Sequence, residues 1–315
     1  MPAKKLQNPI VLTISNHKGG IGKTSITKLL GLYFAEYQQK NVLLIDLDPQ
    51  ASLSQSFLQM ERGPDVKGGI RPPTNPDFVA EEDPAVWERS SSGDIYLHKE
   101  SVLPYQTEVE NLEIIPAYAP SISRVELFAN EHTLEEQILR CLYKTLKDPE
   151  LESNYDIVII DTGPELKPVA LSAIRAADFL LIPVEPERKC VENLPQMMDA
   201  WRTQNRKKPT PIHFLGILIN KLDKRMLVHT EHVHMLEETY GEYLIPQALR
   251  KLSPWINSDL PELDERSVLD YPASNDARKE ALAVCEYVNE KIYGDRDSSN
   301  ELATNGAGEE LVEHG

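Results

Sequence analysis

The amino-acid sequence predicts a doubly wound α/β domain with a mostly parallel sheet and helices on both faces. Short, unbroken apolar runs recur along the chain, as in strands buried on both sides, and helical patterns separate them. The first run, residues 10–14, leads into a glycine-rich turn and a helical pattern, and a second run follows at residues 42–45. Strand, loop, helix and strand at this spacing form a parallel βαβ unit.

Length and composition bound the domain organisation. The 315 residues, 41% hydrophobic and 26% charged, can bury a substantial core, and we expect a single domain over residues 1–294. Proline and glycine recur through residues 59–110, which predicts an insertion without long regular elements. Residues 295–315 are acidic and rich in small polar residues, which predicts a flexible tail.

Targeting and cysteine patterns narrow the class of protein further. No apolar run approaches the roughly 20 residues of a membrane span, and the N-terminus lacks the apolar core of a signal peptide. The three cysteines form no C-x-x-C pair, which disfavours a disulfide framework and a metal-cluster site. We therefore expect a cytoplasmic protein that does not act on membranes.

The remaining elements follow in order along the chain. After the glycine-rich turn, an apolar face predicts a helix that ends near residues 40–41, with Tyr37 as its last apolar position. A final helix is predicted from residue 275 or 276 to about Tyr293. Further strands are predicted at residues 112–115, 157–160, 179–184 and 214–219, with a helix at about 188–206 and a strand-like piece that begins at 244–246.

The turn after the first strand has the composition of a phosphate-binding loop. It reads K-G-G-I-G-K-T, and its glycines let successive N–H groups point at one anion, beside the positive end of the following helix. Lys23 would neutralise phosphate oxygens, and the hydroxyl of Thr24 would bind Mg²⁺. We expect the phosphates to be held by Lys18, Gly19, Gly20, Ile21, Gly22, Lys23, Thr24 and Ser25.

Two acidic segments stand at the ends of predicted strands. D-L-D-P-Q, residues 46–50, places two carboxylates where ligands bind in open α/β sheets. Another buried run ends in Asp161, a position from which a carboxylate reaches Mg²⁺ or its bound water. A simple Asp-Pro turn and an ordinary strand terminus are the alternatives without a catalytic role.

The phosphate loop departs from the general pattern, because His17 stands where a glycine is usual and Lys18 precedes the glycines. In this form it resembles the deviant Walker A motif of the ParA/MinD family of dimeric ATPases, whose D-x-D-P-Q segment and aspartate-ended strand follow in the same order. The resemblance covers residues 10–56 and 111–293. It implies a P-loop NTPase of the deviant Walker A type that hydrolyses ATP with Mg²⁺.

The resemblance also implies catalytic and metal roles for single residues. Lys18 would reach the phosphates bound by the second subunit of a homodimer that forms on ATP binding, and would act there with Lys23. Asp46 would support the metal held by Thr24 and Asp161. The water that attacks the γ-phosphate would be positioned by Asp48.

Base and DNA contacts are implied by position. Asn220 stands where relatives recognise the base, and Pro246 is a second candidate for nucleotide contact; a loop-capping role is the alternative for Asn220. Basic residues collect at 202–208, 221–225 and 250–251. The last two groups match the neighbourhoods where ParA relatives bind nonspecific DNA, which makes Lys221, Lys224, Arg225, Arg250 and Lys251 the candidate DNA contacts.

The expected function is therefore plasmid or chromosome partition, with nucleoid association through nonspecific DNA and a ParB-like adaptor that stimulates turnover. The formal net charge of −17 opposes DNA binding at long range. The alternatives are a MinD-like ATPase on a membrane, a carrier of metal clusters, a switch that binds ATP without hydrolysis, and a family member that positions another cargo. The acidic C-terminus disfavours the first and the unpaired cysteines the second.

Overall fold

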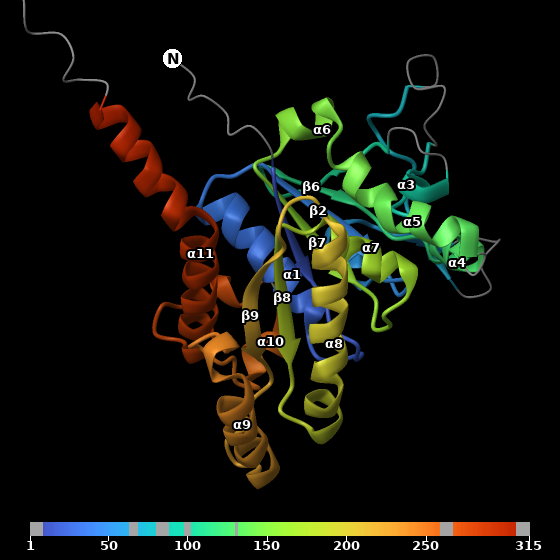
Figure 1. Cartoon of the computed structure of the whole chain (residues 1–315). Helices are drawn as coiled ribbons and strands as arrows, with labels where there is room; N and C mark the ends of the chain where they lie inside the picture. The colour runs from blue at the N-terminus through green and yellow to red at the C-terminus, as the bar shows by residue number, and fades with distance from the viewer. Residues whose placement is uncertain are drawn as a thin grey trace, which may run out of the picture.

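The computed structural model describes residues 9–62, 69–79, 88–97, 102–129, 132–258 and 267–306. Its centre is a seven-stranded sheet in the order β5-β6-β2-β7-β1-β8-β9 (Figure 1). All neighbouring strands are parallel except β5 and β6, which confirms the doubly wound, mostly parallel sheet. The strands are β1 (Ile10–Ile14), β2 (Val42–Leu47), β5 (Tyr105–Gln106), β6 (Leu112–Ile115), β7 (Ile157–Thr162), β8 (Phe179–Val184) and β9 (His213–Ile219).

Alternating side chains of the buried strands pack against two helical layers. On β1, Ile10 and Leu12 face one core with α1 and α11, whereas Val11 faces a second core with α4, α5 and α7. A third core joins the same second face of β8 to α8 and α9. The helices are α1 (Lys23–Leu32), α4 (Ala119–Ala129), α5 (His132–Thr145), α7 (Pro168–Ala176), α8 (Arg188–Lys207), α9 (Leu227–Tyr240) and α11 (Asp276–Gly306).

Two elements that precede the final helix differ from the sequence prediction. Helix α1 ends at Leu32 and continues as a π-helical turn, Tyr33–Tyr37, whose last residue is 42% exposed and so lies outside the core. The strand-like piece at 244–246 forms only isolated bridges, because Pro246 is exposed and lacks the N–H that a strand ladder requires.

The described part of the insertion packs against the sheet. It contains β3 (Glu61–Arg62) and β4 (Ile70–Arg71), which pair with each other, the short helix α3 (Asp94–Leu97), and the edge strand β5. The hydroxyl of buried Ser92 donates to the carbonyl of Asp46 at 2.6 Å. The insertion thereby contacts the end of β2, where the sequence predicts catalytic carboxylates.

The small helices α2 (Ser52–Phe57), α6 (Pro149–Asn154) and α10 (Ser253–Asn257) and the 3₁₀ turns η2 (Gly241–Tyr243) and η3 (Val268–Asp270) complete the described fold. Helix α11 reaches Gly306, so the predicted end of the final helix at about Tyr293 is wrong, and the helix continues past residue 295, where the sequence predicts the start of a flexible tail (Figure 1). That boundary stays a prediction, and residues 307–315 lie outside the described residues. Among the described helices, none is both long and apolar enough to cross a membrane.

Candidate functional site

The glycine-rich turn connects β1 to α1 at the carboxyl edge of the sheet. Gly20 and Gly22 have φ values of 76° and 90°, a region that side chains other than glycine rarely adopt. The side chain of Asn220 lies so close to Gly22 that a Cβ atom there would collide with it. Ile21 between them is fully buried and anchors the turn in the core. The loop backbone is therefore fixed in a curled conformation.

An open cavity of about 760 Å³ lies over this loop. The cavity is lined by Asp48 and by every loop residue from Gly19 to Ser25 except the buried Ile21. Glu108 and Val109 of the insertion also line the cavity, although the sequence patterns gave no reason to expect them there. The cavity thus brings the phosphate loop, the D-L-D-P-Q segment and the insertion to one place.

Lys23 is buried at the start of α1 and points back across the loop. Its ammonium group donates to the carbonyl of Lys18 at 2.9 Å. Burial lowers the pKa of Lys23, and the negative charges of Asp161 and Asp48 oppose that effect in part. A bound phosphate would supply the further negative charge that this buried cation lacks.

Thr24 and Asp161 form the candidate metal site. The hydroxyl of Thr24 donates to Oδ2 of Asp161 at 2.6 Å. Oδ1 of Asp161 is buried and has no hydrogen-bond partner among the described residues, an arrangement that normally costs free energy. Burial, followed by the charge of Asp46, raises the pKa of Asp161 well above its usual range. Hydroxyl and carboxylate oxygens are the ligands that Mg²⁺ prefers, so these residues fit that ion.

Asp46 is also completely buried, but its oxygens are occupied. Oδ1 accepts from the backbone N–H of Asp48 at 3.0 Å, and Oδ2 accepts from both the N–H and the hydroxyl of Ser54, at 2.9 and 2.7 Å. Burial raises the pKa of Asp46 to about 6, although these hydrogen bonds oppose the shift. Asp46 therefore orients the segment that carries Asp48. Ser54 holds the carboxylate of Asp46 in place, a role that the D-L-D-P-Q motif did not indicate.

Asp48 lies at the edge of the cavity and is half-buried. One of its oxygens accepts from the N–H of Gln50 at 2.9 Å, which is the turn geometry that the Asp-Pro alternative predicts. The turn and a catalytic role are compatible, because the hydrogen bond fixes the carboxylate beside the phosphate loop.

Lys18 lies at the head of the loop and makes an ion pair within its own subunit. Its Nζ is 2.7 Å from Oε2 of Glu187, the residue that precedes α8. Burial lowers the pKa of Lys18, but the hydrogen bonds to Glu187 and Cys190 outweigh it, and the pKa lies above its usual value. Glu187 belongs to no motif in the sequence, so its place beside Lys18 was not predicted.

Neither Asn220, the candidate for base contact, nor Pro246, the second candidate for nucleotide contact, is among the residues that line the cavity. Asn220 is buried, donates to the carbonyl of Ile21 at 2.8 Å and accepts from the N–H of Lys221 at 2.9 Å. It therefore supports the phosphate loop, as in the loop-capping alternative. Pro246 is exposed and is not among the residues that line the cavity. In this structure, neither residue presents a free surface to a base there.

The five candidate DNA contacts divide into two groups. The ammonium of Lys221 donates to the carbonyl of Gly20 and lines the cavity. Arg250 pairs with Glu280 and, at 2.9 Å, with Asp276 on α11, which neutralises its charge. The remaining candidates, Lys224, Arg225 and Lys251, are exposed, and Arg225 also pairs with Asp223 at 2.7 Å.

Comparisons with known proteins agree with this architecture. A family model described as an AAA domain matches residues 10–212. The sporulation initiation inhibitor protein Soj of Bacillus subtilis is 31% identical over 68% of this chain and 74% of its own length. A virulence plasmid ParA family protein of Chlamydia psittaci is 25% identical over 90% of this chain and 96% of its own length.

A solved structure supports the fold independently. The ATP complex of a McdA variant from Cyanothece has a TM-score of 0.70 and 19% identity, and the match covers 90% of this chain and 98% of that chain. The family match extends over more than half of the chain and contains the phosphate loop and both acidic segments. The chain belongs to the ParA family of partition ATPases.

Proposed function

We propose that the chain is a Mg²⁺-dependent ATPase that hydrolyses ATP and forms a sandwich dimer with ATP at its interface. The observation that carries the proposal is the buried Oδ1 of Asp161, which has no hydrogen-bond partner in the part of the chain that the structure describes and lies beside the hydroxyl of Thr24. A divalent cation coordinated there would satisfy this oxygen and offset the repulsion between Asp161 and Asp46. The curled loop places its N–H groups and Lys23 next to this position.

Each side chain of the site has a distinct task in this proposal. The loop N–H groups and Lys23 would bind the phosphates, and Thr24 and Asp161 would hold Mg²⁺, which would supply positive charge to the phosphates. Asp48 orients the attacking water, and Asp46 with Ser54 fixes the backbone of Asp48. Catalysis then comes mainly from positioning and charge neutralisation.

The dimer depends on Lys18 in this proposal. In the sandwich arrangement, Lys18 of each subunit contacts phosphates bound by the other subunit, so that ATP joins the two. The side chain is 24% exposed and lies at the head of the loop, where a second subunit can approach it. ATP binding and dimerisation would therefore be coupled.

Nonspecific DNA is the proposed track on which this dimer acts in partition, with a ParB-like adaptor that stimulates turnover. The exposed cations Lys224, Arg225 and Lys251 support phosphate contacts without sequence readout. Two subunits would combine these groups into a longer basic surface. In this way ATP would control DNA binding.

A second candidate is a positioning ATPase of the same family whose track or cargo is a protein or membrane partner. The net charge of −17 and the pairing of Arg250 with two carboxylates favour it, because both reduce the attraction to DNA.

The test combines nucleotide and DNA binding. Lys23→Ala should abolish binding of ATP, and the wild-type ATPase should require Mg²⁺. Binding to random-sequence duplex DNA is then measured with ATP, ADP or no nucleotide over a salt series. Binding that needs ATP and weakens steeply with salt supports the DNA track. ATPase activity without DNA binding in any nucleotide state supports the second candidate.

A further inference from the structure

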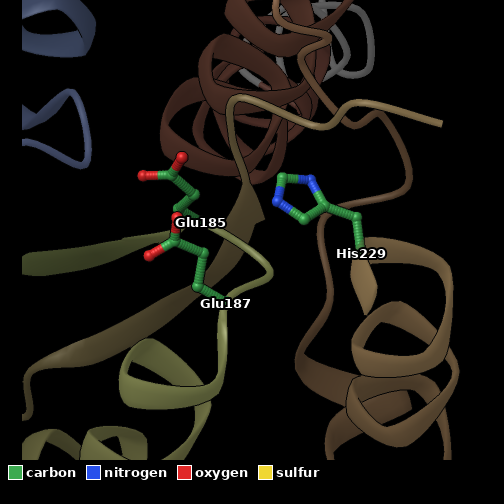
Figure 2. A group of neighbouring side chains, drawn as sticks. All are labelled: Glu185, Glu187 and His229. Carbon is green, nitrogen blue, oxygen red and sulfur yellow. The ribbon is translucent and has the colours of Figure 1, made fainter. Parts of the chain in front are cut away.

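A group of three side chains includes Glu187, the ion-pair partner of Lys18, and none of the three lines the nucleotide cavity. Glu185 and Glu187 follow β8, and His229 lies in the first turn of α9 (Figure 2). One possible ligand atom from each residue lies within 4.8 Å of the other two. His229 is buried, whereas the two glutamates are half-buried. The group could in principle hold a metal ion or act as a hydrogen-bonded network.

The hydrogen bond made by His229 decides between these alternatives. Its Nδ1 accepts from the backbone N–H of Asp223 at 3.1 Å, so the neutral ring carries its proton on Nε2. Figure 2 shows that Nε2 faces Glu185 and Glu187. A nitrogen that carries a proton cannot bind a metal ion, but it can donate to a carboxylate. Lys18 already supplies a positive charge to Glu187 at 2.7 Å. The geometry therefore favours a network over a metal site.

Contacts with Glu187 and with α8 attach the head of the phosphate loop, residues 17 and 18, to its own subunit. Besides the pair of Lys18 with Glu187, the ring of His17 contacts the side chain of Gln196 at 3.0 Å. The amide of Asn193 donates to the carbonyl of His17 at 3.5 Å. Both of these partners lie on α8, which begins directly after Glu187. The loop head is therefore held against the N-terminal half of α8.

We propose that Glu187 is a positioning residue that retains Lys18 in its own subunit and must release it when an ATP-bound second copy of the chain approaches. This inference rests on the proposed sandwich dimer, in which Lys18 contacts the nucleotide of the other subunit. An ammonium group that pairs with Glu187 loses this partner when it turns toward another subunit's phosphates. A ring nitrogen of His229 lies within 4.8 Å of a carboxylate oxygen of Glu187, so His229 lines the place where Glu187 holds Lys18. The exchange of one anion for another is the step that ATP must drive.

The size of the effect follows from the exposure of the pair. Lys18 and Glu187 are 24% and 46% exposed, and pairs of this kind are worth at most about a fivefold change in an equilibrium constant. A sandwich dimer breaks two such pairs, one in each subunit, and the two factors multiply. Loss of the Glu187 charge should therefore strengthen ATP-dependent dimerisation by up to about 25-fold.

The experiment measures the dimer dissociation constant of Glu187→Gln by sedimentation, in Mg²⁺ and a non-hydrolysable ATP analogue. We expect tighter dimerisation than in the wild type, whereas Glu187→Asp, which keeps the charge, should return toward the wild-type value. The matched control is Glu192→Gln on α8, whose partner is Arg188 at 2.7 Å, and it should leave the constant unchanged. The difference between wild type and Glu187→Gln should also shrink at high salt, since salt screens a partly exposed pair.

The outcomes separate this inference from the function on which it rests. If Glu187→Gln dimerises as the wild type does, or more weakly, Glu187 does not restrain Lys18, and the inference is wrong. If the wild type does not dimerise with the analogue at all, the sandwich dimer itself is wrong. An equal gain in Glu192→Gln would indicate a general effect of net charge and would also overturn the inference.

Discussion

Asp46 and Asp161 are register partners on the neighbouring strands β2 and β7, and both side chains are completely buried. Two carboxylates so placed repel each other when both are ionised. Their hydrogen bonds differ, because Asp46 is saturated by Ser54 and the backbone of Asp48, whereas Asp161 keeps one unpartnered oxygen among the described residues. Asp46 thus has a structural role, whereas Asp161 is available to bind a cation.

The first prediction concerns the available carboxylate. Asp161→Asn should weaken nucleotide binding in Mg²⁺ by about 10- to 100-fold, because a ligand of the ion or of its bound water is lost. Binding without Mg²⁺ should change much less. Calorimetric titration with and without the ion measures both values. The matched control is Asp156→Asn, because Asp156 directly precedes the first residue of β7 and lies at the other end of the strand from Asp161. An equal loss of nucleotide binding in that variant would remove Asp161 from the metal site.

The second prediction concerns pH. The pKa of Asp46 is about 6 in the fold and about 4 in an unfolded chain, so the folded state binds the extra proton between these values. Stability of the nucleotide-free protein should therefore fall as pH rises from about 4 to 6, by at most about 3 kcal/mol.

Asp46→Asn has no such proton to lose. Urea unfolding of both proteins at pH 5 and pH 7.5, without Mg²⁺ or nucleotide, should show the unfolding free energy of the wild type falling relative to that of Asp46→Asn. A constant difference between the two proteins would show that Asp46 ionises as freely in the fold as in the unfolded chain.

The sequence predicted the fold because its signals are local. A few consecutive residues are enough to recognise each apolar run, as in β1, β6 and β8, and the loop from Lys18 to Thr24. The missed features depend on long-range neighbours. Lys18 meets Glu187 only because β8 lies beside β1, and this places residues 169 positions apart in contact. Likewise, Arg250 was predicted as a DNA contact, but α11 brings two carboxylates to it.

The third prediction concerns Asp48. Asp48→Ala should lower the ATPase rate strongly and leave ATP-dependent dimerisation intact, because the residue lies beside the phosphate loop without supporting it. Steady-state hydrolysis and sedimentation measure the two properties separately. Turnover equal to that of the wild type would leave Asp48 with only its hydrogen bond to Gln50.

The fourth prediction tests a lysine that the sequence placed in a basic group. Lys208 is 1% exposed, and its ammonium donates to the carbonyls of Ala176 and Ala177 at the end of α7 and to Asp178 at 3.0 Å. Lys208→Met should lower the unfolding free energy by about 3 kcal/mol, because these buried acceptors lose their partner. Lys207→Met, whose side chain is 50% exposed, should be close to neutral in the same denaturant titration. Equal stability of the two variants would contradict the structural role of Lys208.

The last prediction concerns the exposed basic residues before α9. Lys224 and Arg225 are exposed, whereas Lys221 contacts Gly20 and Arg250 is neutralised by α11. Changing Lys224 and Arg225 together to Glu should therefore weaken ATP-dependent DNA binding and reduce its salt dependence without altering ATP affinity.

The matched control for this double variant is Arg206→Glu with Lys207→Glu, an equal change in charge on the exposed end of α8. Fluorescence anisotropy with duplex DNA measures binding over a salt series. A similar loss in both double variants would mean that only net charge matters. Unchanged DNA binding in the Lys224 and Arg225 variant would place the contact on another surface.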